Sequence, residues 1–290
     1  MQAALGAPAC IQGGMGALTQ TLAKIASAAG ADIRTANAVK RILIRHGQAR
    51  GVALENGEEI DAHAVFSNAD PQHTFLKLVD PLELDPGFLT KIRAYRTMGS
   101  MAKVNLALSG PPSLDDEGAR IHIGPDTDYI ERAFDASKYG EFSPEPVLSV
   151  TVPSLADPSL AAQPAHVMSI FVQYAPYRLK TGNWDSRREE FGDAVVKTLS
   201  RYAPGVDKLI LQRQILTPVD LERRFGLTGG HVFHGEHALD QLYAFRPVLG
   251  CARYQTPIKG LYLCGSGTHP GGGITGAPGL NASRAFIAAD

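Results

Sequence analysis

The glycine-rich segment near the end of the chain has the residue types best suited to chemistry. A short apolar run, GLYLCGSG, is followed by the glycine loop HPGGGITGAPG and by an alanine-rich stretch that predicts a helix to Asp290. In a strand, loop and helix unit, glycines let backbone N–H groups approach an anion closely, and the helix N-terminus adds positive potential. The segment is neither a GxGxxG turn after a first strand nor GxxxxGKS, so the pattern itself leaves two interpretations open: a phosphate or flavin site, and a tight helix–sheet turn.

Lys103 is a second residue whose position could carry chemistry. It lies in SMAKVNLAL, a strand-like run in which Met101, Val104, Leu106 and Leu108 surround it with apolar neighbours. Burial lowers the pKa of a lysine, and a lysine with a lowered pKa can relay protons. We therefore predict a functional role for Lys103, with a solvated residue on an edge strand as the alternative.

A group of histidines with one glutamate could be read as a metal site. His231, His234, Glu236 and His237 lie close together in the sequence. Their spacing differs from the HExxH pattern of a metal-binding helix, and no distant group with its own ligand signature accompanies them. We therefore predict no metal site, and we expect these residues at the polar rim of a substrate cavity or as structural histidines.

The composition excludes several classes of function. The 290 residues include 44% hydrophobic and 20% charged residues and carry a net charge of -1. These are the values of an ordinary globular protein, and without clustered Lys and Arg the chain is not expected to bind nucleic acid. No apolar run approaches the roughly twenty residues that cross a bilayer, and Cys10, Cys251 and Cys264 form no CxxC pair. We expect a cytoplasmic protein in a reducing compartment, with peripheral membrane contact left open.

The elements that must position these residues begin with a loop, a helix and a β-meander. Apolar residues recur with helical spacing over residues 15–29, and Gly30 ends the run, which predicts a helix there. Three β-type segments follow, separated by His46-Gly47 and Asn56-Gly57, which are strong hairpin-turn dipeptides. We predict that these segments form a three-stranded meander.

The middle of the chain has an α+β pattern. Strand-like runs occur at residues 100–109, at PVLSVTVP and at HVMSIFVQYAP, after a short helical stretch between Pro71 and Pro81. One face of an amphipathic helix is predicted from Phe191, Val195, Leu199 and Tyr202.

Three motifs carry a resemblance to a known family. The stretch LYLCGSGTHPGGGITGAPGLNASRA resembles the C-terminal FAD-contacting signature of the phytoene desaturase and carotenoid isomerase group. FHGEHALDQLYAFRP and GGMGALTQTLA are similar to the same group, and most similar to its branch of pyridine nucleotide-disulfide oxidoreductase domain-containing protein 2. The resemblance covers essentially the whole chain and extends to flavin amine oxidases. It implies an FAD-dependent oxidoreductase.

The resemblance also implies which residues contact the cofactor. Gly265, Ser266 and Gly267 match positions near the FAD pyrophosphate and ribityl chain, where backbone N–H groups do the binding. The residues that match the turn under the pyrimidine end of the flavin are Ile274, Thr275, Gly276 and Ala277. Val39 matches a strand position whose backbone pairs with the adenine in flavin amine oxidases, although its sequence context fits an ordinary core residue equally well.

The same comparison implies roles on the substrate side. TMGSMAKVNLAL is similar to the Gly-Ser-x-x-Lys strand of amine oxidases, in which the lysine reaches a water beside flavin N5, and that lysine is Lys103 here. Carotenoid desaturases lack an obvious lysine at this position, so Lys103 argues against a carotene substrate. We expect Tyr174, His234 and Phe245 to line the substrate cavity, with core packing as the alternative for Tyr174.

The sequence departs from the family at its beginning. Family members start with a strand, a GxGxxG turn and a helix, followed by an acidic residue that holds the adenosine ribose. The printed sequence contains none of these, and GGMGAL at 13–18 follows a loop instead of a buried strand. We expect truncation or a second chain that supplies this half, and only weak or absent FAD binding by this chain alone.

The resulting fold prediction is α/β plus α+β. Residues 1–70 and 248–290 would form an incomplete Rossmann-like FAD-binding domain, and residues 71–247 an inserted substrate domain with a mixed sheet. The predicted function is removal of a hydride from an apolar or amine-like substrate by FAD. The alternatives are a non-catalytic interaction or assembly protein and an apolar-ligand binder that keep this fold. Homo-oligomer formation is left open.

Overall fold

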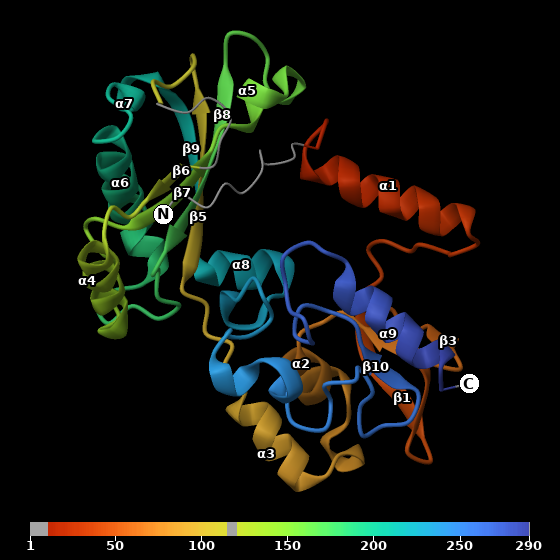
Figure 1. Cartoon of the computed structure of the whole chain (residues 1–290). Helices are drawn as coiled ribbons and strands as arrows, with labels where there is room; N and C mark the ends of the chain where they lie inside the picture. The colour runs from red at the N-terminus through yellow and green to blue at the C-terminus, as the bar shows by residue number, and fades with distance from the viewer. Residues whose placement is uncertain (1–10, 115–120, 290) are drawn as a thin grey trace. The chain divides into compact units, whose positions relative to one another are not determined.

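The structure is a computed structural model that describes residues 11–114 and 121–289, and its contacts divide the chain into two compact units (Figure 1). Unit 1 consists of Met1–Ile33 and Ser100–Val219, and unit 2 consists of Arg34–Gly99 and Asp220–Asp290. The predicted loop over the first ten residues, including Cys10, lies outside the described residues. Among the described helices, none combines the length and the apolar character needed to cross a membrane.

Unit 1 is built on a five-stranded sheet whose neighbouring strands all run antiparallel. In spatial order the strands are β6 (Ile121–Ile123), β7 (Val147–Thr151), β8 (His166–Gln173), β5 (Met101–Leu108) and β9 (Ile210–Leu216). The strands predicted at 100–109 and in the two later apolar runs are confirmed as β5, β7 and β8. The expected mixed sheet is corrected to an antiparallel one, because no pair in it is parallel.

One face of this sheet carries the main core of unit 1. Along β5, Ala102, Val104, Leu106 and Leu108 are at most 1% exposed, and the residues between them are half-buried. The period of two places these four side chains on one face. Helix α6 (Trp184–Ser200) packs its buried residues into the same core and lies alongside the sheet in Figure 1.

Helix α6 shows how local sequence fixes an element. Asn183 accepts a hydrogen bond from Ser186 N (2.9 Å) and Ser186 Oγ accepts one from Asn183 N (3.3 Å), which closes a capping box. Phe191, Val195 and Leu199 are fully buried, as predicted. Tyr202 does not continue this face, because the helix ends at Ser200 and the Tyr202 side chain is 42% exposed.

The other face of the sheet is covered at one corner. Helix α4 (Thr127–Lys138), which is N-capped by Asp126, packs Tyr129 and Ala133 against Val147 of β7. Short helices connect the strands: α5 (Pro153–Ala156), η3 (Pro158–Leu160) and α7 (Val206–Leu209).

Helix α1 (Met15–Ala28) confirms the first predicted helix, although none of its residues is buried. Its entry is held within unit 1 by the hydrogen bond from Gly13 N to Asp157 Oδ2 (2.6 Å). Met15, Leu22 and Ile25 are 50%, 57% and 61% exposed, so the helix presents an apolar stripe.

Unit 2 begins with the predicted three-stranded antiparallel meander of β1 (Val39–Arg45), β2 (Gln48–Leu54) and β3 (Glu59–Asp61). The β1–β2 turn has His46 at φ 54° and Gly47 at φ 70°. Two successive residues with positive φ form the turn that joins tightly twisted hairpins. The dipeptide in the sequence therefore specified this connection.

The rest of unit 2 surrounds one parallel pair of strands, β4 (Val65–Ser67) and β10 (Leu261–Leu263). Phe75, Ile92, Leu261 and Leu263 are at most 2% exposed and belong to its core. The remaining elements are short: α2 (Pro71–His73), the π-helix η1 (Thr74–Leu78), η2 (Pro81–Glu83), α3 (Pro86–Ala94), α8 (Pro218–Phe225), η4 (Thr228–Gly230), η5 (Leu239–Gln241), η6 (Tyr243–Phe245) and α9 (Ala277–Ile287).

The contacts divide the chain elsewhere than at the expected boundaries of 70/71 and 247/248. Residues 71–99 and 220–247 fall in unit 2 with the C-terminal segment, and the N-terminal helix falls in unit 1. The reason for the first shift is visible in the hydrogen bonds. Asp70 Oδ2 accepts a hydrogen bond from Thr228 Oγ1 (2.6 Å), and Arg246 donates one to Ser266 O (2.8 Å). The 220–247 segment is thus bonded to the earlier part of unit 2, through Asp70, and to its C-terminal part, through Ser266.

Candidate functional site

The glycine turn, residues 265–267, follows β10, and its own backbone N–H groups are unused. Within the described residues, the N–H groups of Gly265, Ser266 and Gly267 have no acceptor, whereas Thr268 N donates to Gly265 O (3.0 Å). Gly265 and Gly267 are buried, and Ser266 is half-buried. Buried N–H groups are nearly always hydrogen-bonded in proteins, and successive free donors form an anion-binding nest. This turn is therefore prepared for an acceptor from outside the described chain.

Tight packing explains why the turn needs glycine on both sides of Ser266. A Cβ on Gly265 would lie 2.7 Å from Asn68 O, and a Cβ on Gly267 would lie 2.5 Å from Pro71 Cδ. The turn thus rests on the connection between β4 and α2. His234 lies against the same turn, since its Nδ1 would be 3.2 Å from a Cβ on Gly265.

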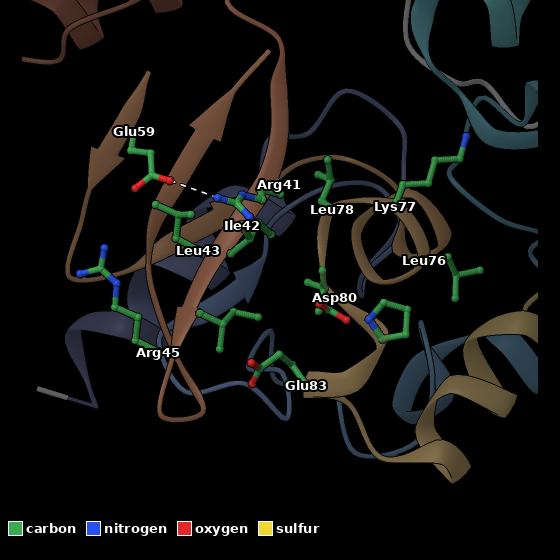
Figure 2. Close-up of a pocket in the computed structure, with 13 residues that line it drawn as sticks. Arg41, Ile42, Leu43, Arg45, Glu59, Leu76, Lys77, Leu78, Asp80 and Glu83 are labelled. Atoms are coloured by element: carbon green, nitrogen blue, oxygen red, sulfur yellow. Dashed lines mark hydrogen bonds and ion pairs between the residues drawn. The ribbon is translucent and has the colours of Figure 1, made fainter. Parts of the chain in front are cut away.

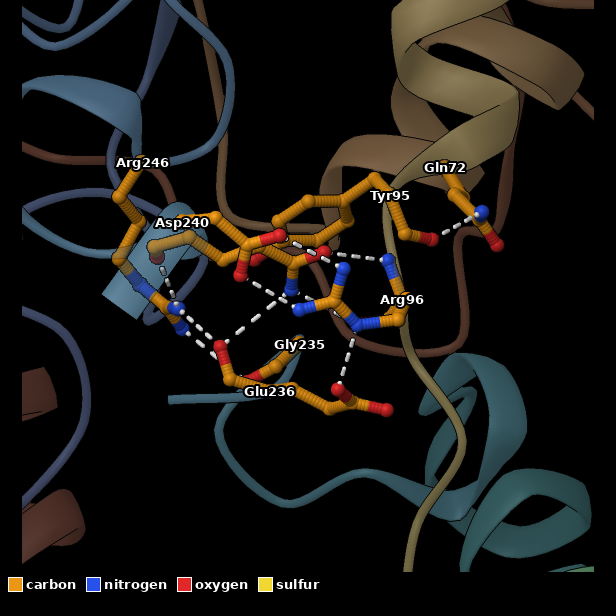
Figure 3. Close-up of polar contacts among 8 residues, drawn as sticks. Gln72, Tyr95, Arg96, Gly235, Glu236, Asp240 and Arg246 are labelled. Atoms are coloured by element: carbon orange, nitrogen blue, oxygen red, sulfur yellow. Dashed lines mark hydrogen bonds and ion pairs between the residues drawn. The ribbon is translucent and has the colours of Figure 1, made fainter. Parts of the chain in front are cut away.

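Arg246 holds the glycine turn from its carbonyl side. The side chain is fully buried, and its Nε and Nη2 both donate to Ser266 O, at 3.1 and 2.8 Å. The guanidinium also donates to carbonyl oxygens of the 233–241 segment (Figure 3). The accepting carbonyl oxygens are those of Phe233 (2.6 Å), Glu236 (3.1 Å), Gln241 (3.3 Å) and Gly235 (3.4 Å).

The carboxylates of the 233–241 segment pair with a different arginine. Arg96 Nε lies 2.7 Å from Glu236 Oε2, and Arg96 Nη2 lies 2.6 Å from Asp240 Oδ1 (Figure 3). The Arg96 side chain is 43% exposed, in contrast to Arg246. Within the described residues, Arg246 is therefore a buried cation that is balanced by carbonyl dipoles and by no carboxylate.

Two buried polar atoms in this part of unit 2 lack a hydrogen-bond partner among the described residues: Tyr95 Oη and His234 Nδ1. Burial raises the pKa of Tyr95 to about 12 and lowers the pKa of His231 to about 4. Burial also lowers the pKa of His234 and of His237. At neutral pH these histidines are uncharged, so the fixed positive charge of the cluster belongs to Arg246.

The histidines form no metal centre within the part of the chain that the structure describes. No group of three or more His, Cys, Asp or Glu side chains is arranged there to hold a metal ion. His234 lies against the glycine turn, and His237 stacks on Phe233 with ring centroids 4.6 Å apart.

The N-terminus of α9 is the second backbone feature that could bind an anion or a polar ring edge. Gly276 precedes the helix at φ 67° and offers no side-chain cap, and the first turn contains no acidic residue. Thr275 Oγ1 accepts only the first helical N–H, that of Ala277 (3.2 Å). By contrast, α3, α4 and α6 are capped by Asp85, Asp126 and Asn183. Ile274, at φ 59°, is 75% exposed in front of α9.

Gly279 adds an open space to the first turn of α9. Apart from its chain neighbours and the nearby backbone of α9, no described atom would lie within 4 Å of a Cβ at this position, so packing against other described segments does not require glycine. Glycine inside a helix costs about 0.5–1 kcal/mol relative to alanine. A close neighbour from outside the described chain would explain this residue.

Lys103 lies on the half-buried face of the unit 1 sheet. Its Nζ is 4.3 Å from the centroid of the Phe171 ring, its register partner on β8. Burial lowers the pKa of Lys103. Next to this pair, Asn105 Nδ2 donates to Gln214 Oε1 (3.0 Å). The expectation of a lysine in a strand is confirmed, but the expected neighbours Val104, Leu106 and Leu108 are on the opposite face of the sheet, because side chains alternate along a strand, and Phe171 lies beside Lys103 instead. The distance of Lys103 from a cofactor is untested.

The remaining predicted site residues are distributed over both units. Val39 begins β1, pairs with Leu54 and is 37% exposed. Tyr174 belongs to unit 1, where its ring centroid lies 5.2 Å from that of Phe134, whereas Phe245 belongs to unit 2 and is 49% exposed. The roles of these residues stay predictions.

A cavity of about 600 Å³ in unit 2 lies between β1 and residues 76–83 (Figure 2). Its charged lining has both signs, with Arg41, Arg45 and Lys77 beside Glu59, Asp80 and Glu83. Arg41 is already bonded to Glu59 at 3.1 Å. The lining therefore selects no ligand charge, and none of the residues predicted to bind a cofactor belongs to it.

Sequence reasoning missed Arg246 and Tyr95. Arginine is almost never fully buried, and a single Arg-Pro in an apolar stretch gives no local sign of burial. The signal that could have found Arg246 is its place in FHGEHALDQLYAFRP, which the family resemblance already singled out.

Comparisons with known proteins identify relatives of this chain. The rat pyridine nucleotide-disulfide oxidoreductase domain-containing protein 2 is 43% identical over 96% of this chain and 51% of its own length. The neurosporene-forming phytoene desaturase of Rhodobacter capsulatus is 28% identical over 90% of this chain and 50% of its own length. The chain thus spans about half the length of these relatives.

Solved structures show the same fold at low sequence identity. An oxidoreductase from Methanosarcina mazei superposes with a TM-score of 0.63 at 19% identity, covering 96% of this chain and 55% of its own. A putrescine oxidase with bound putrescine superposes with a TM-score of 0.56 at 14% identity, and the match covers 96% of this chain and 54% of that chain. The family model for flavin containing amine oxidoreductase matches residues 3–283. Since this match spans nearly the whole sequence, the chain belongs to the flavin containing amine oxidoreductase family.

Proposed function

We propose that this chain forms part of an FAD-dependent oxidoreductase that removes a hydride from an apolar or amine-like substrate. The observation that carries the proposal is the set of three consecutive N–H groups at residues 265–267 without an acceptor among the described residues, in a chain of this family. When bound, FAD would supply the hydride-accepting chemistry. The chain would contribute binding, orientation and a proton-relaying group.

The residues present fit FAD in two places. The free N–H groups of Gly265, Ser266 and Gly267 suit the pyrophosphate, because they can donate to its oxygens in a buried setting. The N-terminus of α9, whose first turn holds no acidic residue, suits the electron-rich pyrimidine end of the flavin through its positive potential, although Ala277 N already donates to Thr275 Oγ1. The backbone of Val39 would pair with the adenine.

Lys103 would act on the substrate side. A half-buried ammonium with a lowered pKa can hold a water and pass a proton at Nζ. Tyr174, His234 and Phe245 would line the cavity for the substrate. In a complete enzyme, Lys103→Met would slow flavin reduction or reoxidation.

The proposed cofactor site needs a second wall. A GxGxxG turn between a first strand and its helix would supply a further helix N-terminus for the pyrophosphate, and no such unit is found in this sequence. We propose that a second polypeptide segment or chain provides it, and that this chain alone binds FAD weakly. The assembled enzyme, and not this chain alone, would select the substrate and the electron acceptor.

An FAD titration with and without the dinucleotide-binding half tests the proposal. The isolated chain should be colourless, and added FAD should raise its melting temperature little, because stabilisation follows RT ln(1 + [L]/Kd). The GxGxxG-bearing half of a relative, added as a separate polypeptide, should restore tight binding of FAD. Gly267→Ala should abolish that gain, whereas the control Gly110→Ala, whose Cβ would meet its nearest atom at 4.0 Å, should retain it. Absence of FAD binding by the reconstituted pair would contradict the proposal.

The exposed stripe of α1 favours one alternative, a non-catalytic assembly protein. Met15, Leu22 and Ile25 could contact a partner chain, a second copy or a membrane surface. A reconstituted complex that forms through α1 but holds no flavin would support this alternative.

A further inference from the structure

Resting on the proposed function, we propose that Arg246 is a positioning residue that holds the glycine turn with its N–H groups directed toward an anionic ligand of the pyrophosphate class. The proposal starts from the Ser266 carbonyl. Its oxygen accepts two hydrogen bonds from one guanidinium, at 3.1 and 2.8 Å. A planar guanidinium that donates twice to one oxygen fixes the direction of that carbonyl.

The direction of the carbonyl determines the direction of the next donor. In a trans peptide unit the C=O and N–H bonds point to opposite sides of the chain. With Ser266 O directed at Arg246, the N–H of Gly267 is directed away from Arg246. This N–H is one of the three donors without an acceptor among the described residues. Arg246 therefore sets the orientation of a donor that it does not itself touch.

The guanidinium itself is fixed from the opposite side. Its Nη2 donates to Phe233 O (2.6 Å), and its Nη1 donates to Glu236 O (3.1 Å) and Gln241 O (3.3 Å). These carbonyls belong to the 233–241 segment, which is anchored in turn by Gln241 Oε1 accepting from Arg96 N (2.7 Å). Rotation of the Ser266 peptide would thus break hydrogen bonds on a fully buried cation.

The charge of Arg246 also favours an anion at the turn. A buried charge without a carboxylate is costly, and a neutral side chain of similar size would fill the space at a lower desolvation cost. Glu236 and Asp240, the carboxylates of the neighbouring segment, pair with Arg96 instead. The charge of Arg246 adds positive potential behind donors that already suit an anion, opposed in part by the buried Asp70 carboxylate, which acts on Tyr95 and His234.

Arg246→Lys in the free chain tests this inference, with Arg96→Lys as the matched control. Lysine keeps the charge but cannot span these carbonyls. Arg96 contacts the same 233–241 segment but not Ser266. We expect the ¹⁵N order parameters of Gly265, Ser266 and Gly267 to fall from about 0.85 to below about 0.6 in Arg246→Lys only. We also expect inorganic pyrophosphate, titrated by amide shifts, to bind about tenfold more weakly, as loss of hydrogen bonds around a charged group implies.

The two proposals fail in different ways. Unchanged order parameters in Arg246→Lys, or equal loss in Arg96→Lys, would overturn the positioning role of Arg246. If pyrophosphate shifts no amide of the turn even when the GxGxxG-bearing half is added, the proposed cofactor contact is contradicted, while the order parameters of the free chain still decide the role of Arg246. Should Arg246→Lys not fold, the Arg246 Nε–H of the wild-type chain decides: slow solvent exchange supports the hydrogen bond to Ser266, and fast exchange overturns it.

Discussion

The core of the five-stranded sheet in unit 1 and the glycine turn with Arg246 in unit 2 both contain fully buried side chains but are held by different forces. In the sheet core, Val104, Ile170 and Val172 of the strands and Phe191 of α6 are 0% exposed and contact other apolar side chains. Around the glycine turn, the fully buried residue is an arginine that is bonded to carbonyl oxygens.

This difference separates stability from function. Apolar packing is non-directional, so the sheet core holds the fold without presenting any chemistry. The polar region is directional, and it retains groups without partners among the described residues: the turn donors, Tyr95 Oη and His234 Nδ1. Thr198 Oγ1 on α6 of unit 1 also lacks a partner among the described residues, so a single unpaired group marks no site. Several such groups around one turn indicate a place where water or another molecule completes the hydrogen bonds.

Phe191→Ala should have the largest effect and should act through unit 1. The ring is fully buried and packs edge-on against Trp184 with centroids 5.3 Å apart. The cavity and the lost burial should lower the free energy of unfolding by about 3–5 kcal/mol in urea denaturation. Tyr139→Ala is the aromatic control, since Tyr139 is 71% exposed and should matter little. A loss below about 1 kcal/mol would show that this core is not close-packed.

Gly267→Ala should have the next largest effect and should act through the polar region. The added Cβ would lie 2.5 Å from Pro71 Cδ and 2.8 Å from Pro71 Cγ, so the turn must shift. We expect a loss of about 1–3 kcal/mol in chemical denaturation, as for overpacked sites. Gly110→Ala serves as the control, and an unperturbed Gly267→Ala variant would show that the turn is loosely held.

Gly279→Ala should have a smaller effect of opposite sign. Apart from its chain neighbours and the nearby backbone of α9, no described atom lies within 4 Å of the new Cβ, so alanine should stabilise α9 by about 0.5–1 kcal/mol. The same methyl group should weaken FAD binding in the reconstituted protein if the cofactor approaches this turn. A thermal melt of the free chain and an FAD titration separate the two effects. Destabilisation of the free chain would argue against open space at this position.

Lys103→Met should give a pH-dependent difference in stability. Burial lowers the pKa of Lys103 below its ordinary value of 10.5, so the folded state disfavours the charged form. The resulting loss of folding stability is fully present below the pKa that Lys103 has in the folded state. It disappears as the pH rises from that pKa toward 10.5, because over this range the unfolded chain binds more protons than the folded one. The stability advantage of Lys103→Met should therefore shrink as the pH increases in urea titrations. A difference that is constant with pH would mean that Lys103 is solvated.

Tyr95→Phe should have the smallest effect. The hydroxyl is buried without a partner among the described residues, and its pKa is raised to about 12 by burial. Removing an unpaired buried hydroxyl should leave the melting temperature unchanged or raise it slightly, within about 1 kcal/mol. A clear destabilisation would instead reveal an ordered water or ligand bonded to Tyr95 Oη.

The local features of the fold were predictable because neighbouring residues specify them. Apolar residues with helical spacing, followed by Gly30, predicted a helix at residues 15–29, and the structure has one at Met15–Ala28. His46-Gly47 predicted the hairpin turn, and alternating residues predicted β5. The glycine-rich segment was recognised from the sequence by the family resemblance, because backbone binding sites require glycines in a fixed order.

Only the tertiary structure decided what depends on residues far apart in the chain. It made the five-stranded sheet antiparallel throughout, it placed residues 71–99 and 220–247 in unit 2, and it buried Arg246 against Ser266. Strand order and the burial of a charge depend on which distant carbonyls and side chains come to surround a residue. An arginine that the sequence alone would place in solvent is buried here because five backbone carbonyl oxygens from two segments accept its hydrogen bonds.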